Sequence, residues 1–204
     1  MEKVISIVGA GGKTTLVHKL AREYHRSGKG VLVTTTTHMY VEADTDLSCD
    51  FFALRDKIIK DGYCMAGQKI SEQKISEQKI SEQSKSKMCG LPYDLLDKLI
   101  KGMPQALDYV IIEADGAKHH SLKYPAADEP VIYPLTTDVI IVLGTWEKGK
   151  LCKDVVFRYE LMQNELGMAE DVVVDDSVID TLRQVYVKKL RDSGFEGRIS
   201  TYYR

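Results

Sequence analysis

The part of the sequence best suited to chemistry is a glycine-rich run that ends in a lysine and two threonines: Gly9, Ala10, Gly11, Gly12, Lys13, Thr14 and Thr15. Glycine lacks a Cβ atom, so its backbone can turn sharply and bring amide N–H groups close to phosphate oxygens. The lysine ammonium would add positive charge there, and a threonine hydroxyl can bind Mg²⁺. The run therefore predicts a site for the phosphates of ATP or GTP.

The glycines are more closely spaced than in the usual phosphate-loop pattern, G-x-x-x-x-G-K-[ST]. That pattern would place its first glycine at position 7, where the sequence has Ile7. The shorter run resembles the loop of Mur-type ligases. The alternative is an ordinary turn between a strand and a helix, with a lysine on the surface. An apolar stretch directly before Gly-Gly-Lys-Thr-Thr favours nucleotide binding over this alternative.

Two carboxylates follow another apolar stretch, in the sequence Tyr-Val-Ile-Ile-Glu-Ala-Asp-Gly. In phosphate-binding α/β proteins, a carboxylate at the end of a neighbouring strand holds Mg²⁺. Asp115 would bind the metal while Glu113 orients a water molecule, or the reverse; alternatively, Asp115-Gly116 is simply a turn. The predicted catalytic residues are thus Lys13, Glu113 and Asp115, and the predicted metal ligands are Thr14, Glu113 and Asp115.

Further polar residues follow predicted strands. Residues 34–38 read Thr-Thr-Thr-Thr-His, and this run either faces a ligand crevice or reflects the preference of threonine for strands. His38 would face the same crevice. Lys118, in the loop after Asp115, would reach a phosphate or substrate, whereas His119 and His120 are expected in solvent.

The apolar periodicity predicts strands that alternate with helices. We expect strands at 3–8, 31–33, 109–112, 139–143 and 172–174, helices at 13–27, 92–101, 155–166 and 177–191, a short strand followed by a short helix at 50–62, and a long loop at 114–136. This order predicts an α/β fold, a three-layer domain like that of the P-loop NTPases with a mostly parallel sheet.

The length of 204 residues predicts a single nucleotide-binding domain that spans residues 1–204. A Lys-Ile-Ser-Glu-Gln unit begins at Lys69 and repeats without change at 74–78 and 79–83. One apolar residue in each unit is too little to form a core. We therefore expect a surface insertion at about 68–88.

The composition excludes several classes of function. A net charge of -2 gives no electrostatic basis for binding nucleic acid or an anionic membrane. The start of the sequence lacks the apolar stretch of a signal peptide. The four cysteines form no C-x-x-C pair, which argues against a zinc site and favours a reducing, cytoplasmic location.

Five stretches carry a resemblance to a known family: G-A-G-G-K-T-T (9–15), T-T-T-T-H-M (34–39), I-E-A-D-G-A-K (112–118), D-E-P-V-I (128–132) and T-T-D-V-I-I-V-L-G (136–144). Over residues 3–160 the sequence resembles the YqeC family, accessory proteins for selenium-dependent molybdenum hydroxylases that are linked to selenium cofactor biosynthesis. The resemblance implies nucleotide binding through residues 9–15, with Glu113 and Asp115 as acidic partners. It also implies a molybdenum hydroxylase or its cofactor precursor as partner.

The expected function is Mg²⁺-dependent binding of ATP or GTP, with hydrolysis or phosphoryl transfer, during maturation of the hydroxylase cofactor. The alternative is a nucleotide-gated binding or delivery protein with little turnover. The sequence departs from the family where Phe157-Arg158 replaces a His-Arg pair, so no role passes to that histidine. It also lacks an N-K-x-D-like run, and the nucleotide base is therefore not predicted.

Overall fold

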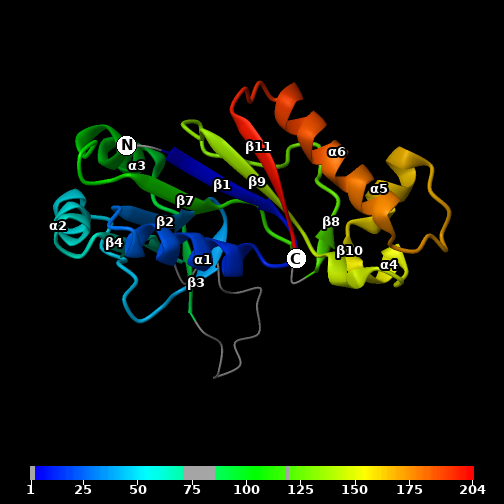
Figure 1. The fold of residues 1–204 in the computed structure, drawn as a ribbon, viewed down its shortest axis with the longest axis horizontal. Helices are drawn as coiled ribbons and strands as arrows, with labels where there is room; N and C mark the ends of the chain where they lie inside the picture. Colours follow the sequence, from blue (N-terminus) through cyan, green and yellow to red (C-terminus); the bar gives the residue numbers. More distant parts are fainter. Residues whose placement is uncertain (1–2, 71–85, 118–119) are drawn as a thin grey trace. The chain divides into compact units, whose positions relative to one another are not determined.

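The computed structural model describes residues 3–70, 86–117 and 120–204 (Figure 1). The chain divides into two compact units, Met1–Val4 with Val17–Glu113, and Ile5–Leu16 with Ala114–Arg204. The single nucleotide-binding domain stays a prediction. The repeats fall mostly at 71–85, and that part of the expected insertion lies outside the described residues, as do Lys118 and His119.

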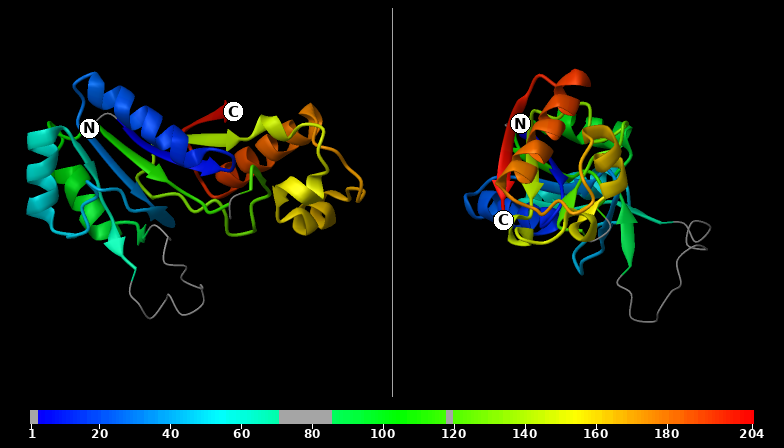
Figure 2. Two further views of the ribbon diagram at one scale, coloured as in Figure 1. Left: turned by 90° about the horizontal axis from the view of Figure 1, so that it is seen from below. Right: turned by 90° about the vertical axis from the view of Figure 1, so that its right-hand side faces the viewer.

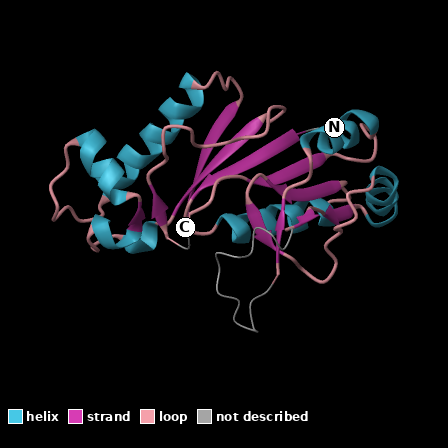
Figure 3. Cartoon of the chain, turned by 180° about the vertical axis from the view of Figure 1, so that it is seen from behind, coloured by secondary structure: helices cyan, strands magenta, loops and turns pink. Residues whose placement is uncertain are grey.

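The central element is a six-stranded, all-parallel sheet (magenta strands in Figure 3). Its strands are, in spatial order, β11 (Arg198–Tyr203), β9 (Asp138–Leu143), β1 (Lys3–Gly9), β7 (Tyr109–Glu113), β2 (Val31–Thr35) and β4 (Tyr63–Met65). The inner strands are mostly apolar and buried, as expected when both faces of a parallel sheet are covered. The α/β class and the parallel sheet are confirmed, while the P-loop fold and the three layers remain predictions.

In the first unit, β2 pairs with β4 and β7. The expected strand and helix at 50–62 form one helix, α2 (Phe51–Asp61), which begins at its N-cap Asp50 and ends at Gly62 in the left-handed conformation. Helix α2 contacts β4 and α3 (Tyr93–Gly102). A small antiparallel sheet has the order β3 (His38–Tyr40), β6 (Lys87–Cys89) and β5 (Gln68–Lys69).

The second unit has its own apolar core. Helix α6 (Asp176–Asp192) lies against β9 (Figure 1 and Figure 2) and buries Leu182 and Tyr186 beside Val139 and Ile141 of the strand. The remaining elements are β8 (Leu122–Lys123), η2 (Thr145–Glu147), α4 (Cys152–Val155), β10 (Val156–Phe157) and α5 (Tyr159–Leu166). Strand β10 pairs in parallel with β8.

Three expectations for this unit were wrong. Residues 172–174 form no strand, because only Val173 makes an isolated bridge, to Leu151. The predicted helix at 155–166 is interrupted by β10 and by Arg158, whose φ of 65° is left-handed. The loop at 114–136 contains the short strand β8.

The N-terminal helix α1 spans Lys13–Arg26, close to the predicted 13–27, and it carries polar residues along one side. Helix α6 is similarly amphipathic, with several buried apolar residues among charged ones. Among residues 3–70, 86–117 and 120–204, none of the helices combines the length and the hydrophobicity of a transmembrane span. The cytoplasmic location remains a prediction.

We expect Leu182→Ala to lower the free energy of unfolding by about 2–5 kcal/mol, because it removes a fully buried side chain from the core of the second unit. Leu166→Ala is the control, since Leu166 is 39% exposed on α5, and it should cost roughly 0.5 kcal/mol. Urea denaturation measures both. Equal losses for the two variants would contradict the core described here.

Candidate functional site

The glycine run forms the connection between β1 and α1. Gly9, Gly11 and Gly12 have φ values of 91°, 82° and 119°, which residues with a side chain rarely adopt. The Ala10 N–H donates to the Val142 carbonyl at 2.9 Å, and the Leu16 N–H donates to the Gly12 carbonyl at 2.9 Å. Helix α1 therefore begins directly after three residues that curl the backbone.

Packing against neighbouring backbone accounts for two of these glycines. A Cβ atom on Gly9 would lie 2.2 Å from the Val142 carbonyl oxygen, and one on Gly11 would lie 2.4 Å from the Ser121 carbonyl oxygen. Gly12 differs, because its Cβ would meet only the side chain of Arg204, at 2.8 Å from Cδ and 2.9 Å from Nη1. Gly12 is thus the position where the loop faces a movable, charged group.

Lys13 is buried, with 6% of its surface exposed, and its ammonium donates to the Gly9 carbonyl at 2.7 Å. The Lys13 side chain therefore reaches from the first residue of α1 back across the loop to its first glycine. Thr14 and Thr15 follow it and are exposed. The first turn of α1 contains no acidic residue, and amide groups in a first helical turn have no acceptor within the helix. This end of α1 is electropositive.

The predicted acid Asp115 lies in a buried charge cluster, which we define as Asp115, Lys123, Glu129 and Arg158. Asp115 and Lys123 form an ion pair with both side chains fully buried, and Asp115 has a left-handed φ of 72°. The Lys123 ammonium also donates to the Gly116 carbonyl at 2.6 Å and contacts Glu129 at 2.8 Å. Tyr186 donates its hydroxyl to Asp115 at 3.2 Å. Asp115 is therefore a neutralised, well-anchored carboxylate.

Burial and ion pairing shift the pKa values in this cluster. Burial lowers the pKa of Lys123 to about 8, against the effect of its hydrogen bond to Glu129, and the positive charge of Lys13 contributes to the lowering. Burial would raise the pKa of Glu129, but hydrogen bonds from Arg158 and Lys123 outweigh it and lower that pKa to about 2. Glu129 is ionised at neutral pH, and Lys13 lies near enough to Lys123 to repel it.

The first unit contains the other predicted acid, Glu113, at the end of β7. Its carbonyl accepts hydrogen bonds from the Thr35 hydroxyl at 2.6 Å and from the Thr36 N–H at 3.1 Å. The Thr34 hydroxyl accepts from the Leu91 N–H at 3.2 Å. These threonine hydroxyls thus bond to backbone. The position of Glu113 relative to the glycine loop stays a prediction.

The structure describes two of the predicted histidines, His38 and His120, and they belong to different units. His38 is exposed on β3 in the first unit. His120 stacks on Phe157 with ring centroids 5.5 Å apart. Across the described ranges, no group of three or more His, Cys, Asp or Glu residues is placed to hold a metal ion. The metal roles of Thr14, Glu113 and Asp115 remain predictions.

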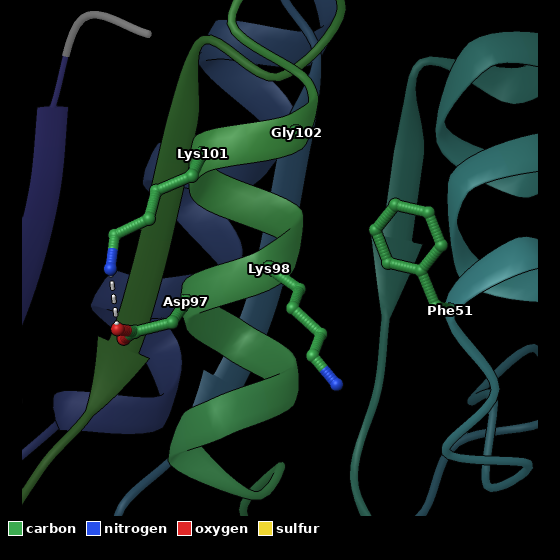
Figure 4. Close-up of a pocket in the computed structure, with 5 residues that line it drawn as sticks. All are labelled: Phe51, Asp97, Lys98, Lys101 and Gly102. Atoms are coloured by element: carbon green, nitrogen blue, oxygen red, sulfur yellow. Dashed lines mark hydrogen bonds and ion pairs between the residues drawn. The ribbon is translucent and has the colours of Figure 1, made fainter.

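Two hollows of about 450 Å³ each lie elsewhere. Figure 4 shows the one beside α2 and α3 in the first unit, lined by Phe51, Asp97, Lys98, Lys101 and Gly102, with Lys101 donating to Asp97 at 2.9 Å. The other, in the second unit, is lined by Thr145, Lys148, Asp176, Ile179, Asp180 and Tyr203. The glycine loop lines neither hollow.

Comparison with known proteins identifies the family. The model of the YqeC protein family matches residues 5–160. An uncharacterized protein YqeC of Escherichia coli (strain K12) is 30% identical over 174 residues, which cover 84% of this chain and 63% of that protein. The chain belongs to the YqeC family. It spans less than two thirds of the length of that relative.

The YqeC-matched segment contains the glycine loop and the whole buried charge cluster, whereas Tyr186 and Arg204 lie beyond it. Sequence reasoning found the loop and Asp115 but missed Lys123, Glu129 and Tyr186 as their neighbours. Glu129 stands in one of the stretches that carry the YqeC resemblance. That stretch was the signal that could have pointed to Glu129. Ion pairs between residues far apart in sequence leave no periodic pattern from which they could be predicted.

We expect Gly11→Ala to destabilise the protein by about 1–3 kcal/mol more than Gly12→Ala. In both variants alanine must adopt an unfavourable positive φ. The added methyl group at position 11 would clash with backbone atoms, whereas the one at position 12 would meet only the flexible side chain of Arg204. Thermal and urea unfolding of the two variants measure the difference. Equal stabilities would contradict the packing of Gly11 against Ser121.

Glu129→Gln should reduce the loss of stability in acid. Because the pKa of Glu129 is lowered from 4.5 to about 2 on folding, the unfolded state binds the proton first, and stability falls as pH drops from 4.5 towards 2. The variant lacks this contribution, so its stability should fall less over the same pH range. Urea midpoints at several pH values test this, with Glu160→Gln on the exposed surface of α5 as control. Parallel pH profiles for wild type and Glu129→Gln would contradict it.

Proposed function

We propose that this protein binds the phosphates of a nucleoside triphosphate, ATP or GTP, on the loop between β1 and α1. The observation that carries the proposal is the combination of three positive-φ glycines with the buried ammonium of Lys13 at the start of the helix. A helix N-terminus attracts anions through its amide groups and dipole. Here a curled backbone and a lysine reinforce that attraction.

The surrounding charges support an anionic ligand. Lys13 and Lys123 are close enough to repel each other, and both are buried. Such a pair of cations is stabilised by nearby negative charge. Asp115 and Glu129 compensate Lys123. A bound phosphate would add negative charge beside Lys13 and Lys123.

Mg²⁺ would arrive with the nucleotide. Mg²⁺ sites of this kind use one or two protein groups together with phosphate oxygens, so a cluster of several carboxylates is not required. The hydroxyl of Thr14, an exposed residue at the start of α1, is the first ligand we assign, and Asp115 or Glu113 is the acidic one. The bound ion would neutralise charge on the phosphates.

Hydrolysis or phosphoryl transfer is the leading activity, with Lys13 holding the phosphates and Asp115 or Glu113 holding the metal or orienting water. One observation favours the alternative, a nucleotide-gated binding or delivery protein. Asp115 already accepts bonds from Lys123 and Tyr186. A carboxylate so engaged is a poor proton acceptor, which is consistent with slow turnover.

Family membership suggests the biological setting. Within the YqeC family we propose an accessory role in maturation of the cofactor of selenium-dependent molybdenum hydroxylases. The nucleotide would then drive or gate an action on the hydroxylase or on its cofactor precursor. Measuring phosphate release with and without that partner would distinguish an enzyme from a nucleotide-gated binding protein.

We expect Lys13→Ala to weaken binding of ATP or GTP about tenfold or more, because it removes a charge-assisted contact to phosphate. Calorimetric titration in the presence of Mg²⁺ measures the affinity. Lys19→Ala removes the same charge from an exposed position on α1 and should leave affinity within about twofold. Unchanged affinity for Lys13→Ala, or no binding of either nucleotide to the wild type, would overturn the proposal.

A further inference from the structure

A second cation lies against the loop from a distant part of the sequence. Arg204 follows the last residue of β11 (Figure 1, where the end marked C lies beside the start of α1). Its side chain occupies the space that a Cβ atom on Gly12 would need, with Nη1 at 2.9 Å. Lys13 is the next residue along the loop. The loop is therefore approached by two cations, one buried and one exposed.

The backbone of Arg204 is fixed in position. Its N–H donates to the Leu143 carbonyl at 3.1 Å, and its carbonyl accepts from the Thr145 N–H at 2.7 Å and the Thr145 hydroxyl at 2.6 Å. These bonds continue the pairing of β11 with β9. The start of the side chain is thus held as firmly as a residue within the sheet.

An aromatic ring positions the other end of the side chain. The guanidinium carbon of Arg204 lies 5.3 Å from the centroid of the Trp146 ring. That ring in turn covers Gly144, where a Cβ atom would lie 3.0 Å from the Trp146 Cη2 atom. A cation over a tryptophan face is stabilised by the ring quadrupole. Trp146 therefore holds the guanidinium next to the loop. The Trp146 side chain itself remains 47% exposed.

We infer that Arg204 is a phosphate-binding residue of the loop, held over Gly12 by Trp146 and directed at the outer phosphates of a nucleoside triphosphate. This inference rests on the nucleotide binding proposed above. Lys13 is buried and donates to the Gly9 carbonyl, so it supplies charge from within the fold. Arg204 supplies charge from the solvent side, and its planar group can bind two phosphate oxygens at once.

The test compares Arg204→Ala and Arg204→Lys with the matched control Arg198→Ala. Arg198 begins the same strand, and its side chain is 69% exposed. Calorimetry with Mg²⁺ and ATP, GTP or inorganic tripolyphosphate gives the affinities. Arg204→Ala should weaken triphosphate binding about tenfold, Arg204→Lys should recover part of it, and Arg198→Ala should stay close to wild type.

A second readout comes from the single tryptophan of the sequence, Trp146. Because Arg204 lies over its ring, ligand binding at Arg204 should change the tryptophan emission of the wild type, with tripolyphosphate as well as with nucleotide. The emission of Arg204→Ala should change little on ligand addition. Circular dichroism of each variant checks that the fold is retained.

The two proposals fail in different ways. Triphosphate affinity of Arg204→Ala equal to that of Arg198→Ala overturns the inference, and so does emission that stays constant while calorimetry detects binding. If Lys13→Ala loses affinity in the same experiments, nucleotide binding on the loop stands without Arg204. If the wild type binds neither nucleotide nor tripolyphosphate, both proposals are overturned.

Discussion

The close contact between the glycine loop and the end of β9 is the constraint on which the rest of the candidate site depends. The Val142 carbonyl accepts from the Ala10 N–H and leaves no room for a side chain at Gly9. The Ser121 carbonyl imposes the same restriction at Gly11 and also accepts from the Gly144 N–H. Backbone from three segments therefore meets without intervening side chains, and the start of α1 is fixed by this contact.

The buried charge cluster imposes a second constraint. An ammonium and a carboxylate removed from water lose solvation that their attraction only partly restores. Lys123 compensates with several partners, namely Asp115, Glu129 and the Gly116 carbonyl. Asp115 and Arg158 both adopt left-handed backbone conformations, and strain of this kind persists only where surrounding contacts enforce it. The cluster thus fixes the direction of the chain after β7 and before α5.

Sequence reasoning succeeded where the signal was local. The apolar runs of β1, β7 and β9 and the periodicity of α1 and α6 are properties of adjacent residues, and the glycine loop follows from their order. It failed where tertiary contacts determine whether a segment forms a strand. The strand β11 was missed because its residues are half-buried or exposed and partly polar, as at a sheet edge. Val172 to Val174 have strand-type side chains, but their pairing is limited to one isolated bridge, between Val173 and Leu151.

The site residues divide in the same way. Lys13 and Asp115 stand in short motifs that can be read directly, whereas Lys123 has the charge of a surface residue and is fully buried. Arg204 carried no motif, since its relation to Gly12 exists only once β11 is paired with β9.

The order of strands also has a kinetic consequence. Strand β9 lies between β1, which ends at Gly9, and β11, which begins at Arg198, so its two neighbours are far apart in sequence. Parallel pairings between such remote segments close large loops and form slowly compared with helices and hairpins. The Arg204 guanidinium would therefore reach the glycine loop late during folding, only after β11 had paired with β9.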